Sequence, residues 1–270
     1  MKERVAVNER VDVLGVEVSA IDMEAAVANI SAWIDAGQRE YVCVTGVHGV
    51  IESQGDRSLI EIHNRAGMVT PDGVPLVWCG RYAGAESMSR VYGPDLMLAT
   101  LEASVARGWR HFFYGAAPGV VEELSERLTG RFPGLNIVGT FSPPFRDLTD
   151  AETTDVATRI NTARPDIVWV GLSTPKQERW MARFRDLLDS PVLIGVGAAF
   201  DMHAGRLRQA PVGMQRAGLE WLFRLIMEPR RLWRRYLKIV PTFLWRVVRR
   251  PPVLVRTPRS TPLSDITGTL

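Results

Sequence analysis

Several polar side chains follow short apolar runs, at positions where a strand is expected to end. Thr45 and His48 stand in TGVHGV, and Asp72 stands in a PDG turn with apolar residues on both sides. A partly desolvated carboxylate has a raised pKa, which suits a general base. Asp72 alone is more often a turn residue, and a tight turn with a solvated histidine explains His48 equally well. The stretch RVYGPDL that follows favours Asp72 as the candidate base.

The segment WVGLSTPKQERWM (169–181) carries the strongest local signal. An apolar run ends at a glycine, a Ser-Thr-Pro turn follows, and a helix is expected to open with Lys176 and Gln177. Polar groups on such a first turn point into a ligand crevice, where Lys176 would meet a phosphate and Gln177 would exchange hydrogen bonds. The alternative is helix capping, with Glu178 facing the helix dipole.

Two glycine-rich segments predict close backbone approach to a ligand. One is GVGAAFDMHAG, which holds Gly197 and an Asp201 suited to ribose hydroxyls or a base edge, and the other is GAAPG, which begins at Gly115. Neither has the G-x-G-x-x-G spacing of a dinucleotide site or the lysine of a P-loop.

Phosphate binding without a metal is expected. Arg90 is suited to phosphate or to a surface ion pair, and Asp95 is expected to cap a helix. The four histidines are scattered and no DxD-like pair occurs, so the sequence predicts no metal site and no cofactor. Arginines and helix N-termini would then neutralise a bound diphosphate.

The elements that must position these residues alternate between strand and helix. Buried strands are expected at 41–45, 111–115, 136–140, 166–171 and 192–197, and helices at 22–37, 118–131, 150–163 and 176–188. This order predicts an α/β fold with a Rossmann-like, mainly parallel sheet flanked by helices. Ligands bind such sheets at the carboxyl ends of the strands, where the polar residues lie.

The 270 residues, 46% of them hydrophobic, fit one large domain with an appendage. We expect a catalytic core over 1–208, a helical appendage over 209–250 and a disordered tail over 251–270. Cys43 and Cys79 lie in apolar runs and are expected to be buried thiols. The polar N-terminal residues do not resemble a signal peptide, so a cytoplasmic location is expected.

Charge is unevenly distributed along the chain. From Arg224 on there are eleven Lys/Arg and two acids, whereas the first 223 residues hold 22 basic and 28 acidic residues. Arginines interleaved with Trp and Leu suit the inner face of an anionic membrane. No run reaches the ~20 apolar residues of a membrane span. Peripheral association is therefore expected, with homo-oligomer formation as a competing use of the apolar residues.

Taken together and in this order, the segments resemble the WecG/TagA/CpsF family of bacterial glycosyltransferases. The resemblance spans roughly residues 10–240 and rests on Thr45 at a strand end and on TPDGVPLVW, R-x-x-GPDL, FFYGAAPG, VGLSTPKQE, GVGAAFDMHAG and QRAGLEWLFRLIMEPRRLWRRY. It implies metal-independent transfer of a sugar, with inversion, from a UDP-sugar to a polyprenyl-diphosphate-linked saccharide of a cell-surface polysaccharide. The sugar and the acceptor saccharide stay open.

The resemblance also implies residue roles. Asp72 would activate the acceptor hydroxyl, Thr45 and Gln177 would line the site, and Arg90 would lie near the diphosphates. The tail arginines would reach over the site, and they are Arg224, Arg231 and Arg234. Many members carry Asn two residues after the strand-end Thr; here Val47 stands there, so His48 is a candidate for that role. Pro229 predicts that one helix stops near Glu228 and another begins.

Some of these features also suit two other functions. A nicotinamide-dependent oxidoreductase would need the glycine fingerprint, which is missing. A nucleic-acid-binding module would use the basic, aromatic tail, but the acidic body makes nucleic acid a poor partner.

Overall fold

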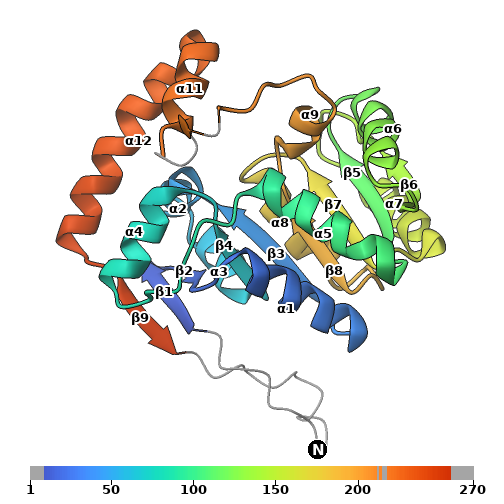
Figure 1. The fold of residues 1–270 in the computed structure, drawn as a ribbon, viewed down its shortest axis with the longest axis horizontal. Helices are drawn as coiled ribbons and strands as arrows, with labels where there is room; N and C mark the ends of the chain where they lie inside the picture. The colour runs from blue at the N-terminus through green and yellow to red at the C-terminus, as the bar shows by residue number, and fades with distance from the viewer. Residues whose placement is uncertain (1–8, 212, 215–217, 257–270) are drawn as a thin grey trace, which may run out of the picture.

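The computed structural model describes residues 9–211, 213–214 and 218–256, except for the side chains at positions 231, 235 and 256 (Figure 1). A six-stranded sheet lies at its centre, in the order β4-β3-β8-β7-β5-β6, and every neighbouring pair is parallel. The strands are β3 (Glu40–Thr45), β4 (Met68–Pro71), β5 (Arg110–Gly115), β6 (Asn136–Phe141), β7 (Ile167–Gly171) and β8 (Val192–Gly195). The predicted fold class is confirmed, and β4 is a strand that the periodicity did not predict.

Helices cover both faces of this sheet. One face carries α1 (Met23–Asp35), α5 (Gly93–Arg107), α6 (Val120–Arg131) and α9 (Ala199–His203). The other carries α2 (Val47–Ser53), α3 (Arg57–Arg65), α4 (Val74–Tyr82), α7 (Asp150–Ala163) and α8 (Lys176–Phe184). Strands buried on both sides explain the continuous apolar runs in the sequence.

The side chains of each strand alternate between two apolar cores. In β3, Cys43 packs with the α4 and α8 side, whereas Val42 and Val44 pack with the α1 and α5 side. In β5, Phe112 and Phe113 divide in the same way. This two-residue period decides which side chains of a strand enter which core. Cys43 and Cys79 are buried and free, as predicted.

A second, antiparallel sheet lies beside the first, in the order β2-β1-β9. It comprises β1 (Glu9–Val13), β2 (Val16–Ser19) and β9 (Val253–Arg256). The prediction of a disordered tail from 251 on is therefore wrong for Val253–Arg256, because this apolar segment pairs with β1. Residues 257–270 of that predicted tail lie outside the described part.

Two helices of the described part belong to the appendage. They are α11 (Glu220–Met227) and α12 (Pro229–Arg249). The helical conformation is interrupted between them at Glu228, as Pro229 predicted. α12 packs against α2 and buries Leu232, Ile239 and Phe243. Among the described helices, none combines the length and the low polarity that a membrane span requires.

Two helix ends differ from expectation. α8 ends at Phe184 rather than Leu188. α5 begins at Gly93 with Tyr92 in the N-cap position, so Asp95 lies in the first turn and is not the cap. Pro94 is at the second position of the helix and fits this start, because proline is tolerated in the first turn, where its missing N–H has no partner within the helix.

Candidate active site

A cavity of about 470 Å³ opens at the carboxyl ends of β3, β4, β7 and β8. Its walls come from the segments that follow these strands, from the start of α5, and from the appendage through Arg224 and Tyr236. The predicted residues that line it directly are His48, Asp72, Gln177, Gly197 and Arg224. Segments separated by more than 170 positions in the chain thus meet at one edge of the sheet, where ligands bind this class of fold.

Asp72 is held at the cavity by main-chain bonds on both sides. Its N–H donates to the carbonyl of Thr45 at 3.0 Å, and its Oδ1 accepts from the N–H of Gly93 at 3.0 Å. The other oxygen, Oδ2, lies beside Gly46, where an added Cβ would be 3.6 Å away. Among the described residues, no group donates a hydrogen bond to Oδ2, so this oxygen remains available to accept a proton.

Burial raises the pKa of the Asp72 carboxyl above its ordinary value. The Gly93 N–H bond and the positive charges of Arg90 and Arg224 oppose that rise. A carboxylate with a raised pKa, one anchored oxygen and one accessible oxygen has the properties of a general base.

Arg90 lies directly behind Asp72. Its Nε donates to the Asp72 carbonyl oxygen at 3.3 Å, and its Nη2 forms an ion pair with Glu220 of α11. The guanidinium carbon lies 4.1 Å from the ring centre of Tyr92. Arg90 therefore joins the candidate base to the appendage, and its guanidinium is already paired with a carboxylate.

Of the three predicted tail arginines, Arg224 is the one seen at the cavity. Its Nε is buried and has no hydrogen-bond partner within the described part of the protein. Arg234 lies over the ring of Trp233 at 5.3 Å, is exposed, and is not part of the cavity lining. Arg231 belongs to α12, and its side chain lies outside the described residues.

The amide of Gln177 has a defined orientation. The Glu178 carboxylate accepts from Gln177 Nε2 at 3.2 Å and from Thr174 Oγ1 at 2.8 Å. The nitrogen of the amide therefore faces Glu178, and its oxygen is left as an acceptor with no partner among the described residues. Glu178 is fully buried, and burial raises the pKa of its carboxyl. Glu178 lies in the first turn of α8, a position that is also compatible with the alternative in which its carboxylate faces the helix dipole.

Two glycines of the β8 end make room for this amide. A Cβ at Gly195 would lie 3.1 Å from Gln177 Cδ, and one at Gly197 would lie 3.4 Å from Oε1. Gly197 also has a positive φ of 52°. The glycines inferred from the sequence to allow approach of a ligand thus allow approach of Gln177, a side chain that lines the cavity.

Thr45 lies beneath the cavity floor, while its neighbours Val44 and Gly46 line it. The Thr45 hydroxyl is buried without a partner among the described residues. His48 lines the cavity from α2, 3.9 Å from the Glu52 carboxylate.

Three other predicted residues do not line this cavity. Gly115 has φ 124°, and its Cβ would lie 2.6 Å from the Gly171 carbonyl oxygen, so close packing of β5 on β7 explains this glycine. Lys176 is exposed at the start of α8. Asp201 lies on α9 directly before the lining residue Met202 and is not part of the lining.

Several lining residues were not singled out from the sequence. Tyr92 and Met202 are linked by a hydrogen bond of 3.4 Å from the hydroxyl to the sulfur, and Ser173 lines the cavity with a positive φ of 64°. Tyr236 enters from α12, packed on Trp221. Tyr92 and Ser173 lie inside quoted motifs, whereas no local pattern pointed to Tyr236.

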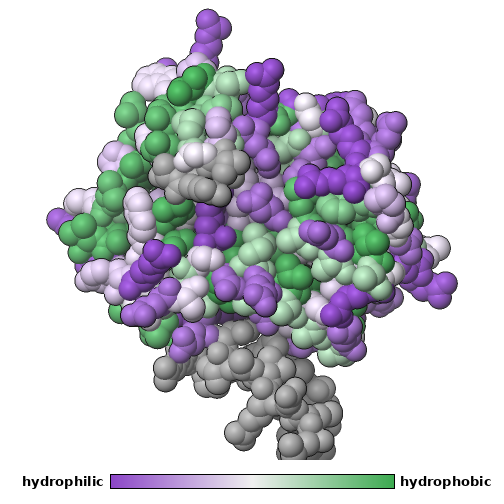
Figure 2. All heavy atoms as spheres, viewed as in Figure 1, coloured by the Kyte–Doolittle hydropathy of each residue, from purple (hydrophilic) through white to green (hydrophobic). Residues whose placement is uncertain are grey.

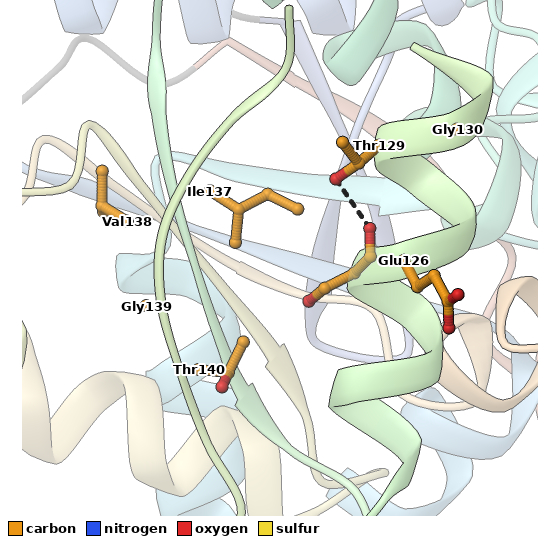
Figure 3. A pocket seen from close by; sticks show the side chains of 8 residues that line it. Glu126, Thr129, Gly130, Ile137, Val138, Gly139 and Thr140 are labelled. Carbon is orange, nitrogen blue, oxygen red and sulfur yellow. Dashed lines mark hydrogen bonds between the residues drawn. The ribbon is translucent and has the colours of Figure 1, made fainter. Parts of the chain in front are cut away.

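A second hollow, of about 620 Å³, lies between α6 and the edge strand β6 (Figure 3). Glu126 is its one titratable lining side chain, and Thr129 donates its hydroxyl proton to the Ser125 carbonyl at 2.8 Å. This hollow lacks the paired charges of the first. Across the described residues there is no group of three or more His, Cys, Asp and Glu arranged to hold a metal ion.

Residues 11–255 match the model of the "Glycosyl transferase WecG/TagA/CpsF family". Curated relatives carry the name N-acetylglucosaminyldiphosphoundecaprenol N-acetyl-beta-D-mannosaminyltransferase. One from Bacillus spizizenii is 31% identical over 81% of this chain and 82% of its own length, and one from Bacillus subtilis is 30% identical over 78% and 84%. One from Staphylococcus aureus is 26% identical over 89% of this chain and 92% of its own.

Proposed function

Because this chain belongs to the WecG/TagA/CpsF family of glycosyltransferases, we propose that it transfers N-acetylmannosamine from a UDP-sugar to N-acetylglucosaminyl-diphosphoundecaprenol. The sugar and the acceptor follow the names of the relatives in Bacillus and Staphylococcus. The family match gives no support to the oxidoreductase or to the nucleic-acid-binding module.

The observation that carries the mechanism is the accessible Oδ2 of Asp72 in the cavity at the sheet edge. In the proposed reaction, Oδ2 takes the proton of the acceptor hydroxyl as that oxygen attacks the anomeric carbon. The bond from this carbon to the UDP oxygen breaks on the opposite face, and UDP leaves with the electron pair. A single displacement of this kind inverts the anomeric configuration.

Positive charge is needed where UDP departs. Arg224 lines the cavity with a buried, unpartnered Nε among the described atoms, and we assign it to the diphosphate. Arg90, one layer behind, would act through the Asp72 loop or on the diphosphate itself. Gln177 would accept a hydrogen bond from a hydroxyl or acetamido N–H of a bound sugar, since its oxygen is the free end of the amide.

The acceptor carries a long lipid, so the protein is proposed to work at a membrane surface, on the inner face. α12 supports this with five exposed apolar side chains at spacings of three and four residues, along one helix face: Trp233, Leu237, Val240, Leu244 and Val248. Basic residues of α12 flank the stripe. Such a helix lies in the interface rather than crossing it.

The experiment uses the full chain with UDP-N-acetylmannosamine and N-acetylglucosaminyl-diphosphoundecaprenol in detergent, and measures release of UDP. Turnover of this pair, with the mannosaminyl product identified by mass spectrometry, supports the proposal. A panel of other UDP-sugars serves as the control. Preferred use of another donor would overturn the choice of sugar, and absence of UDP release with every donor would overturn the reaction.

A further inference from the structure

The catalytic core exposes an aromatic pair outside the appendage, on α4. Trp78 is 62% exposed and Tyr82 is 73% exposed, and they are four residues apart, so they share one face of the helix. Arg81 is exposed beside them. Neither aromatic side chain has a role in the cavity.

Packing on the opposite face of α4 holds these aromatic groups outward. Leu76, Val77 and Cys79 are buried there, and Gly80 lies so close to Met88 that an added Cβ would overlap its sulfur. The helix has no room to roll and bury Trp78, so the exposure of this face is built into the core.

α4 and α12 pack on the same side of the central sheet. Phe243 and Val247 of α12 belong to the same apolar cluster as Leu76 and Cys79 of α4. At the other end of α4, a Cβ on Gly218, just before α11, would lie 3.1 Å from Val74. Figure 2 shows hydrophobic side chains gathered over the region of α12 on one face of the protein.

The basic residues of the neighbouring appendage indicate what kind of partner this face binds. Residues 220–250 hold nine Lys/Arg and two acids, and one of the acids, Glu220, is neutralised by Arg90. A second copy docked through the same face would bring two strongly basic surfaces together, which repel. An anionic lipid surface instead attracts the arginines and accommodates Trp and Tyr at the headgroup level.

We propose that α4 is a membrane-contacting element of the catalytic core, which docks together with α12 on an anionic bilayer surface. The proposal rests on the proposed function, because an acceptor held in a membrane is the reason for the protein to dock there. α4 begins at Val74, two residues after Asp72, so contact of α4 with lipid brings the candidate base to the level where the diphosphate of a membrane-bound acceptor lies.

The test is the full-length double variant Trp78→Ser/Tyr82→Ser in co-sedimentation with vesicles of phosphatidylglycerol and phosphatidylcholine. We expect its partition coefficient to fall about tenfold relative to the unmodified protein. Phe145→Ser is the matched control: Phe145 is 85% exposed, lies between β6 and α7, and its loss should leave binding unchanged. Thermal unfolding verifies that both variants fold, and the two single variants repeat the test with smaller changes.

Transfer assays separate this proposal from the proposed function. The double variant should keep normal turnover on a short-chain, water-soluble acceptor and lose turnover on acceptor embedded in vesicles. Unchanged vesicle binding by the double variant overturns the role of α4, whatever the activity. If the unmodified protein is a dimer and the double variant is a monomer that still binds vesicles, the α4 face contacts a second copy of the chain. That result also overturns the role of α4 in membrane contact. Lack of transfer on every acceptor instead overturns the proposed function, while the vesicle result still decides the role of α4.

Discussion

Arg90 and Glu220 form a partly buried ion pair that ties the core to the appendage. The same guanidinium donates to the backbone of Asp72, so one side chain links the candidate base to α11. Any anion that takes Arg90 from Glu220 would loosen α11, and the diphosphate of a substrate is such an anion. We therefore predict that substrate binding and movement of the appendage are coupled through Arg90.

Glu220→Gln is predicted to loosen α11 without affecting the core. Loss of a partly buried charge pair is expected to increase local opening about fivefold, corresponding to ~1 kcal/mol. Limited trypsin digestion, which cleaves after the exposed arginines of the appendage, measures this as a faster cut. Glu102→Gln, on an exposed site of α5, is the control. Equal digestion rates for the two variants would show that the pair does not retain the appendage.

Asp72→Asn is predicted to reduce kcat by at least about a hundredfold, because the amide cannot accept the proton. The fold should survive, since the Asn side-chain oxygen can still accept from Gly93. Asp201→Asn is the matched comparison: Asp201 follows β8 but lies outside the cavity lining, and its variant should keep near-normal turnover. A similar loss in both variants would remove the special role of Asp72.

The stability of Asp72→Asn should depend on pH in a defined direction. Burial raises the pKa of Asp72 in the folded protein, so the ionised form is less favourable there than in the unfolded chain. This penalty is present above the folded pKa and disappears below the ordinary value of about 3.9. The variant should therefore have a higher Tm than the unmodified protein at pH 7 to 8, with a gain that shrinks towards pH 4. A gain that grew on acidification would contradict the assignment.

Glu178→Gln is predicted to lower kcat/KM about tenfold by releasing the orientation of the Gln177 amide, a loss of ~1.4 kcal/mol. The new amide is able both to donate and to accept, so it no longer fixes which end of Gln177 faces the ligand. The effect should appear mainly in KM for the donor, which a general loss of structure would not produce. Thr174→Val removes the other bond to Glu178 and should have a smaller effect.

The fold was largely predictable because its strands are buried on both faces. That burial produces the apolar runs from which five of the six parallel strands were predicted. β4 was missed because it is short and runs directly into the turn that holds Asp72. The pairing of β9 with β1 was missed because it joins segments some 240 residues apart, and no local pattern reports such a contact.

The candidate site was predictable where polar residues lie in the turn or the first helical turn that follows an apolar run, as Asp72 and Gln177 do. It was less predictable where glycines are concerned. Gly115 serves the contact of β5 with β7, and Gly195 and Gly197 make room for Gln177. A glycine in a sequence shows that no side chain occupies the position, but it does not show which neighbouring group approaches the backbone there. The contribution of Tyr236 depends on how α12 folds back over the core, which is a tertiary property.

β9 changes how the appendage moves. α11 and α12 leave the core after α9 and return to it at Val253–Arg256, where four residues pair with β1, so the appendage is fastened at both ends. A segment fastened in this way does not search free solution when it opens, and Arg224 keeps a high effective concentration at the cavity. Truncating the chain just before β9 would leave the appendage attached to the core at one end. Each closure would then have a larger entropic cost, even though every cavity residue is still present.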